Sequence, residues 1–319
     1  MDGLEYIQRK QVAWAIRNGY TPVGSTFQNE GKKNYLENQD NNLFRPLTNE
    51  TRTQFMNADG GETKDYLKNG KHYRPKINAL HSSSAIVVNT FQYWHNKDVY
   101  PILYACKLCS KRPSGVDIMY ENIGSNYPKI FSTSRNPSAN EIKFEEKKFE
   151  ISSDRYLFPR TPNIDVVIEN FQTQTYAIES KFTEPYTYKY KKEEDKRISQ
   201  RYIDKIDFAI WKGLDSLRQL AIEISKENNN NYLDSAQLIK HILGLKKAKK
   251  NFRLLYLWYD VIGLDGTEHR KEIEQFAKKA KEDNIKFSHI TYQEVIMKLA
   301  QEFYGGNEEY CNYLTERYV

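Results

Sequence analysis

Three charged residues in two short apolar segments have the types and spacing to carry out chemistry together. Asp165 lies in the segment 163–170, and Glu179 and Lys181 lie two residues apart in the segment 175–182. If both segments are strands, Glu179 and Lys181 face the same side, and we expect Asp165 to converge on them across the strand pairing. The alternative is an ordinary surface Glu–Lys pair, but charges within hydrophobic strands need a reason.

This set of side chains has the composition of a metal-dependent hydrolytic site. Clustered carboxylates repel each other unless a cation joins them, and their hard oxygens suit Mg²⁺, for which Mn²⁺ can substitute. Such a metal polarises a phosphate and helps to deprotonate water, while a nearby ammonium stabilises the phosphate or positions the hydroxide. We therefore predict phosphodiester hydrolysis, with Asp165 and Glu179 as metal ligands and Lys181 positioning or activating water.

The elements that must hold these residues follow from the hydrophobic pattern. Strands are expected where polar and apolar residues alternate or where apolar residues form short runs. These segments are 141–151, 163–170, 175–182 and 252–261, with a short strand near 285–290. The segment 252–261 is nearly all apolar and is expected to be fully buried. Helices are expected over 1–20, 81–96, 187–226 with a break near Gly213, 233–245, 269–283 and a final stretch to about 304. This order predicts an α/β fold, a mixed β-sheet flanked by helices on both faces.

Capping residues set the bounds of two of these helices. Ser82, Ser83 or Ser84 can cap the first turn of the helix at 81–96. Asp234 is the predicted N-cap of the helix at 233–245, and Gly244 is expected to close it.

Two regions are expected along the chain. Residues 1–80 form a polar, weakly periodic N-terminal segment of helices and loops that we expect to help recognise DNA, and residues 81–319 form the catalytic core with inserts.

The strings PNIDVVI (162–168) and AIESK (177–181) resemble the signature of the PD-(D/E)xK nuclease superfamily, although Pro162 and Asp165 are offset from a strict Pro-Asp pair. AIESKFTEPY, LDSAQLIKHILGL and LLYLWYD also resemble bacterial proteins described as predicted type II-like restriction endonucleases. The resemblance is best over 158–262 and looser over 80–300. It implies a restriction-endonuclease-like fold, with Asp165, Glu179 and Lys181 as the three residues of the motif.

Further site residues are implied by RecB-type members of the superfamily. In these proteins a helix after the lysine strand carries a Gln and, four residues on, an aromatic residue; Gln237 and His241 occupy this spacing. The resemblance gives Gln237 a supporting role near the metal or a phosphate, whereas His241 departs from the usual Tyr. A polar pair on a solvated helix face is the alternative. His81 is a candidate metal ligand by the same resemblance, or an ordinary histidine.

A third acidic ligand is expected from the preceding strand. Glu145 is the candidate, and Glu141 is the runner-up. The pair Cys106-x-x-Cys109 is half of a zinc site, but structural zinc needs four ligands and Cys311 is the only other cysteine. Two reduced thiols are the favoured interpretation.

Charge points weakly to a polyanionic partner. The chain has a formal net charge of +6, and Lys246, Lys247, Lys249 and Lys250 form a cluster without acids that fits DNA phosphates or, equally, a solvated helix end. No apolar run of about 18 residues predicts a membrane helix, and no signal-peptide pattern opens the chain. We expect a cytoplasmic protein.

Together these features predict a Mg²⁺-dependent DNA endonuclease that restricts foreign DNA. The expected partner is double-stranded DNA, and a homodimer is expected because cutting two strands calls for two active sites. A repair or recombination nuclease and a DNA-binding module with a degenerate nuclease fold are the alternatives. No P-loop motif predicts an ATP-driven motor.

Overall fold

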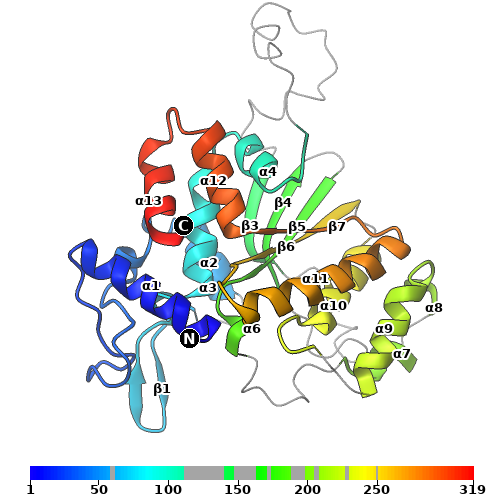
Figure 1. Ribbon diagram of the computed structural model, residues 1–319, viewed down its shortest axis with the longest axis horizontal. Helices are drawn as coiled ribbons and strands as arrows, with labels where there is room; N and C mark the ends of the chain where they lie inside the picture. Colours follow the sequence, from blue (N-terminus) through cyan, green and yellow to red (C-terminus); the bar gives the residue numbers. More distant parts are fainter. Residues whose placement is uncertain are drawn as a thin grey trace, which may run out of the picture.

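The central feature of the computed structural model is one mixed β-sheet (Figure 1). The structure describes residues 1–57, 62–110, 140–146, 163–170, 174–187, 198–204, 208–226, 230–248 and 251–319. Within these residues the sheet has five strands in the order β3-β4-β5-β6-β7. They are β3 (Asn140–Glu146), β4 (Ile164–Asn170), β5 (Gln174–Lys181), β6 (Phe252–Trp258) and β7 (Phe287–Thr291).

The sheet changes direction at its middle strand. β3, β4 and β5 pair antiparallel, whereas β5, β6 and β7 pair parallel. The predicted hairpin or meander at 163–182 and the strand beginning at Phe252 are confirmed, and β6 is buried from Leu254 to its end. The predicted α/β architecture, a mixed sheet between helices, is confirmed.

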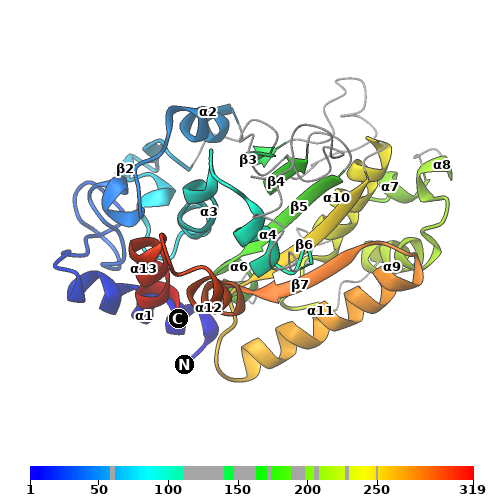
Figure 2. The same cartoon turned by 90° about the horizontal axis from the view of Figure 1, so that it is seen from above.

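Helices cover both faces of the sheet (Figure 2). On one face Val166 and Ile178 join a core with α3 (Ser83–Phe91), α4 (Tyr100–Ala105), α12 (Tyr292–Glu302) and α13 (Glu308–Tyr318). On the other face Val167 and Ala177 pack with α9 (Asp215–Lys226), α10 (Ser235–Lys247) and α11 (Leu264–Glu282). This alternation follows from the two-residue period of a strand, which sends successive side chains to opposite faces.

Three short helices lie in the described parts of residues 184–226, ahead of α9. They are α6 (Glu184–Thr187), α7 (Arg201–Asp204) and α8 (Phe208–Trp211). Gly213 lies between α8 and α9 with a φ of 72°, so the predicted break near this residue is confirmed.

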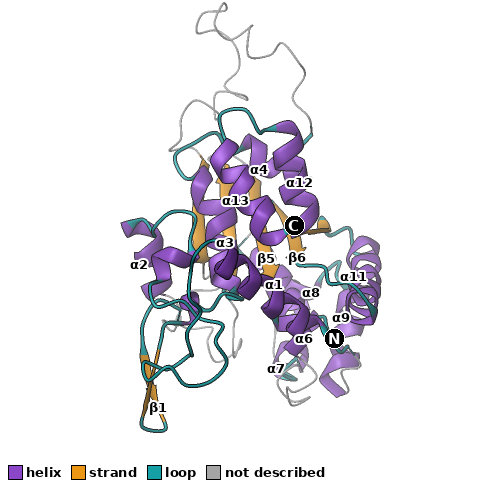
Figure 3. Cartoon of the chain, turned by 60° about the vertical axis from the view of Figure 1, so that its left-hand side comes forward, coloured by secondary structure: helices purple, strands orange, loops and turns teal. Residues whose placement is uncertain are grey.

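The N-terminal segment consists of short elements and loops that pack beside the helical layer formed by α3, α4, α12 and α13 (Figure 3). It contains α1 (Gly3–Arg17), η1 (Gln39–Asn42), α2 (Asn49–Asn57), a ribbon of β1 (Tyr66–Lys68) and β2 (Lys71–Tyr73), and η2 (Lys76–Asn78). The buried guanidinium of Arg317 on α13 ties it down by donating to Gln11 Oε1 at 3.0 Å, the Asn42 carbonyl at 2.8 Å and the Leu80 carbonyl at 3.3 Å. The boundary at residue 80 stays a prediction.

Helix ends agree with the capping residues at the N-termini and differ at one C-terminus. Ser82 Oγ accepts from the Ala85 N–H at 3.2 Å, and Asp234 Oδ1 accepts from the Gln237 N–H at 2.9 Å, as predicted. The prediction that Gly244 closes α10 was wrong, because the helix continues to Lys247. Gly244 is buried in the packed helix, and this packing outweighs the cost of about 1 kcal/mol of an interior glycine.

The C-terminal helix α13 was not expected. Its sequence is polar and follows two glycines, so the hydrophobic pattern gave little indication. Tyr310, Leu314 and Tyr318 recur at four-residue spacing and are buried against α12 and α3.

Candidate active site

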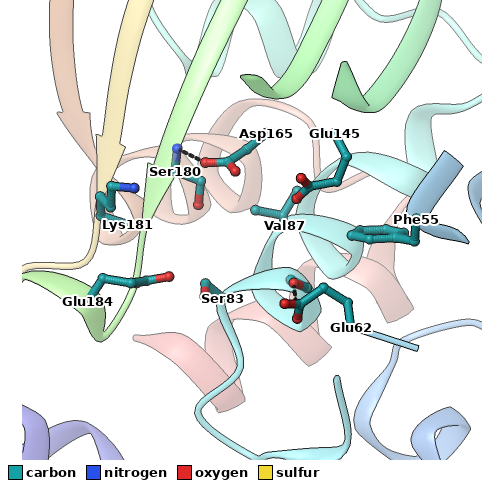
Figure 4. A pocket seen from close by; sticks show the side chains of 10 residues that line it. Phe55, Glu62, Ser83, Val87, Glu145, Asp165, Ser180, Lys181 and Glu184 are labelled. Atoms are coloured by element: carbon teal, nitrogen blue, oxygen red, sulfur yellow. Dashed lines mark hydrogen bonds between the residues drawn. The ribbon is translucent and has the colours of Figure 1, made fainter. Parts of the chain in front are cut away.

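A cavity of about 150 Å³ lies where β4 begins and β5 ends, facing the first turn of α3 (Figure 4). Antiparallel pairing brings the start of β4 next to the end of β5. The cavity is rich in carboxylates and is lined by Phe55, Glu62, Ser83, Ser84, Val87, Glu145, Asp165, Ser180, Lys181 and Glu184. Two of the three predicted core residues, Asp165 and Lys181, therefore share this space.

Asp165 is fixed on the cavity wall by the neighbouring strand. Its Oδ2 accepts from the Ser180 N–H at 2.7 Å, which orients the carboxylate toward the cavity (Figure 4). Burial raises the pKa of Asp165 well above its ordinary value, and the negative charges of Glu179 and Glu145 raise it further against the opposing charge of Lys181. A carboxylate in this situation gains most from a nearby cation.

Glu179, the third predicted core residue, does not line the cavity; it is fully buried and lies between Lys181 and His241. Lys181 Nζ donates to its Oε1 at 2.5 Å, and His241 Nε2 lies 2.7 Å from its Oε2. Burial opposes the charged form, but the charges and hydrogen bonds of Lys181 and His241 outweigh it and hold the pKa of Glu179 below its ordinary value. Glu179 is thus a carboxylate kept ionised inside the protein.

Glu145 is the acid that β3 contributes to the cavity. Its neighbours Phe144 and Glu146 pair with Val166 and Ile164, so Glu145 stands opposite Asp165 in the ladder. Its φ of 52° is in the left-handed region, a strained conformation for a residue other than glycine. Burial raises the pKa of Glu145 to about 7, although a hydrogen bond from Asn163 Nδ2 at 3.2 Å lowers it.

These side chains fit a magnesium ion in part. Asp165 and Glu145 face one polar cavity, and their raised pKa values reflect charge that a cation would relieve. Among the described residues, no three His, Cys, Asp or Glu side chains are grouped closely enough to form a complete metal site. Mg²⁺ is often held by only one or two carboxylates together with waters and substrate phosphate, so two facing acids satisfy its chemistry.

The supporting residues predicted on α10 and before α3 lie near the site but outside the cavity lining. His241 contacts Glu179 directly, whereas Gln237 lies one helical turn earlier and is half-buried. His81 is half-buried with its ring edge-on to Tyr35, and burial lowers its pKa to about 4, so it is a neutral imidazole near neutral pH. The roles of Gln237 and His81 stay predictions, and nothing is described of the side chain of Glu141.

The two described lysines of the predicted basic cluster, Lys246 and Lys247, are not brought to the cavity. α10 runs from Ser235 toward the start of β6, so its last turn lies at the opposite end of the strands from Lys181. There Lys246 Nζ donates to the Lys212 carbonyl, and burial lowers the pKa of Lys246. Lys247 is half-buried in the same turn, and Lys249 and Lys250, like Pro162, lie outside the described residues.

The Cys-x-x-Cys pair begins at the C-cap of α4, near the strands β5 and β6. Cys106 is buried, and burial raises the pKa of its thiol. Cys109 is partly exposed, and all three cysteines are free thiols. Within the part of the chain that the structure describes, these two cysteines do not belong to a group of metal-ligating side chains.

Sequence reasoning missed two acids of the cavity and the contact made by His241. Glu184 lies three residues beyond Lys181 and accepts from the Phe182 and Thr183 N–H groups at 3.0 Å each, a proximity that the sequence could have indicated. Glu62 lies in the weakly periodic N-terminal segment, where no pattern marked it, and accepts from Ser84 Oγ at 2.8 Å.

The fold and the site together define a class of protein. A five-stranded mixed sheet flanked by helices, with acids and a lysine at the ends of two central strands, is consistent with a restriction-endonuclease-like fold. A family model described as restriction endonuclease associating with ARP matches residues 8–319. The chain belongs to this family, since the match covers nearly its whole length.

Other comparisons add no further relatives. No curated protein and no solved structure matches the chain. Across the described residues, the chain forms no helix with the length and apolar character needed to cross a membrane.

Proposed function

We propose that the chain is a Mg²⁺-dependent DNA endonuclease of the PD-(D/E)xK superfamily, with Asp165, Glu179 and Lys181 as its motif residues. The observation that carries the proposal is the arrangement of these three side chains at the ends of two paired strands. Asp165 and Lys181 both line the cavity, and Lys181 donates a hydrogen bond to the buried Glu179. Membership of a restriction endonuclease family supports the nuclease activity.

The residues of the chain divide the work of hydrolysis between them. Asp165 and Glu145 would hold the metal from the cavity side, and the buried Glu179 would add its negative charge close to Asp165. A bound Mg²⁺ would polarise the scissile phosphate and lower the pKa of water. Lys181, held by Glu179, places its ammonium at the cavity wall, where it would orient the attacking water and stabilise charge on the phosphate.

The biological setting that we propose is restriction of foreign double-stranded DNA in the cytoplasm. A homodimer would supply one active site for each strand. The description of the family names an association with ARP, and we propose the same association for this chain. Mn²⁺ would substitute for Mg²⁺ because both prefer oxygen ligands.

Plasmid cleavage tests the proposal. The purified protein is incubated with methylated and unmethylated plasmids in Mg²⁺, Mn²⁺ or EDTA, beside Glu179→Gln and Lys181→Met. The control variants are Glu169→Gln and Lys143→Met, which change the same residue types in another Glu–Lys pair of the sheet, 3.8 Å apart. Discrete, metal-dependent fragments that only the site variants lose support the proposal.

Other outcomes favour the alternative functions. A metal-dependent smear in place of discrete fragments would favour a repair or recombination nuclease. Retention of DNA without cleavage in either metal, with or without ARP, would contradict an active nuclease and favour a degenerate DNA-binding module.

A further inference from the structure

The β1–β2 ribbon is a hairpin that projects from the body of the protein (Figures 1 and 3). Asn69 and Gly70 form its two-residue turn with φ values of 50° and 72°. Two successive left-handed residues make the tight turn whose twist matches that of paired strands. The hairpin therefore has a defined shape at its tip.

The base of the ribbon is locked to a neighbouring loop. Thr26 pairs with Tyr73, and the Phe27 N–H donates to the His72 carbonyl at 3.0 Å. The Phe27 ring stacks on His72 at 5.1 Å, and the Arg74 guanidinium lies 4.9 Å from the Phe27 ring. These contacts hold the hairpin at a fixed angle.

The side chains near the tip combine like charges with an exposed apolar residue. Lys68 pairs directly with Lys71 across the strands, an arrangement in which like charges repel. Leu67 is 71% exposed on the opposite face. Tyr66 and Tyr73 stack at 5.1 Å on the same face as the two lysines. Facing lysines are stabilised by an anion that contacts both of them.

Charge is concentrated in this part of the chain. Residues 62–76 contain five basic and two acidic side chains, a formal charge of +3 in a protein whose total is +6. Lys64 and Lys68 are exposed, and Lys71 is exposed while paired with Glu30 at 2.6 Å. The segment therefore offers a polyanion a basic surface of defined shape.

The ribbon begins at the rim of the active-site cavity. Glu62 lines the cavity, and its carbonyl accepts from the Ile77 N–H at 2.9 Å, so both ends of the segment meet at this rim. Tyr35 is half-buried between this segment and α3: its ring contacts His81, and burial together with the nearby Tyr66 and Glu62 raises its pKa. Residues 62–66 therefore link the cavity directly to the start of the ribbon.

We propose that the β1–β2 hairpin enters a groove of duplex DNA beside the phosphate that the cavity cleaves. Lys68 and Lys71 contact phosphates, and Leu67 and Asn69 at the tip contact base edges. The major groove, roughly 12 Å wide, admits a two-stranded β-ribbon. The proposal rests on the proposed nuclease function and assigns recognition to a specific element of the N-terminal segment.

Binding of a labelled 30-base-pair duplex in EDTA, followed by fluorescence anisotropy over a range of salt concentrations, tests this assignment. Two lost phosphate contacts should lower the magnitude of the slope of log K against log salt by about 2 in Lys68→Ala/Lys71→Ala. Lys278→Ala/Lys281→Ala on α11 removes the same charge from exposed positions and should keep the wild-type slope. Leu67→Ser should change the preference among duplex sequences and leave the slope unchanged.

The outcomes separate the two proposals. Wild-type slope and affinity in Lys68→Ala/Lys71→Ala would overturn the role of the hairpin and leave the nuclease proposal standing. Equal losses in the hairpin and α11 variants would also overturn it, because the effect would then be one of net charge. A wild-type protein that neither binds nor cuts DNA would overturn both.

Discussion

His241 Nε2 and Glu179 Oε2 lie 2.7 Å apart in the interior of the protein, and both side chains are almost completely buried. With Lys181 on the other oxygen, the carboxylate of Glu179 is held at both ends. A helix on one side of the sheet thus sets the orientation of a charge at the end of a central strand. We consider His241 a positioning residue for Glu179 and, through it, for Lys181.

Removing the contact between His241 and Glu179 should weaken catalysis by lowering the affinity of the site for its metal ion. We expect His241→Ala to lower activity or apparent metal affinity by about 10- to 100-fold, as for other partners of metal-site residues. His241→Gln retains a donor and should recover part of the loss. Cleavage rates across a Mg²⁺ titration measure this, with His289→Ala as the control. A loss in His241→Ala that additional Mg²⁺ and His241→Gln both leave unchanged would indicate a merely structural role.

The raised pKa of Glu145 predicts an unusual dependence of stability on pH. The carboxyl binds its proton up to about pH 7 in the folded protein but only up to about 4.5 when unfolded. The folded state therefore holds more protons between these values, and its stability falls as pH rises through this window, by up to roughly 3 kcal/mol. Denaturation in EDTA at pH 5 and 8 measures the fall.

Two comparisons test whether the loss of stability between pH 5 and 8 comes from Glu145 in the cavity. Glu145→Gln should flatten the decline relative to wild type, and Mg²⁺ should restore stability at pH 8 in wild type more than in the variant. Parallel curves for the two proteins would show that Glu145 titrates normally.

Asp165 should oppose stability while serving activity. Because its pKa is raised well above the ordinary value, the ionised carboxylate is unfavourable in the folded protein without a cation. We expect Asp165→Asn to raise the melting temperature in EDTA at pH 8 and to lower cleavage by about 10²-fold or more. Differential scanning calorimetry and plasmid cleavage measure the two effects. A lowered melting temperature would instead mark Asp165 as a structural residue.

Arg317 should anchor the N-terminal segment. It is fully buried, and its guanidinium donates to Gln11, Asn42, Leu80 and Tyr313. Arg317→Met leaves buried acceptors without donors and should cost about 3 kcal/mol of unfolding free energy in urea denaturation. Arg317→Lys should rescue little, because lysine lacks the planar set of five donors. Arg9→Met, at an exposed position on α1, is the control and should be near neutral.

Local patterns in the sequence predict the strands and the pair Glu179 and Lys181, because strand periodicity alone places i and i+2 on one face. Asp165 and Glu145 could be placed near them once antiparallel pairing was assumed. The contact of His241 with Glu179 joins residues 62 positions apart, and Glu62 reaches the cavity from a segment without periodicity. Such contacts depend on how helices pack on the sheet, which single-sequence patterns do not encode.

The basic cluster illustrates the same limit. Lys246 and Lys247 lie in the last turn of a helix, as the solvated-helix-end interpretation requires, but the direction of that helix carries them to the end of the strands opposite Lys181. The charge and the helix can be predicted from the sequence, whereas the direction of the helix relative to the sheet depends on the topology.

The size of the cavity limits what it can distinguish. About 150 Å³ is room for on the order of five water molecules, enough for a phosphate and its solvent but not for a sugar and a base. All nucleotides are alike in the part that enters such a space. Cutting and choosing where to cut would then be carried out by separate parts of the molecule, and the choice could diverge between relatives while the cutting residues stayed the same.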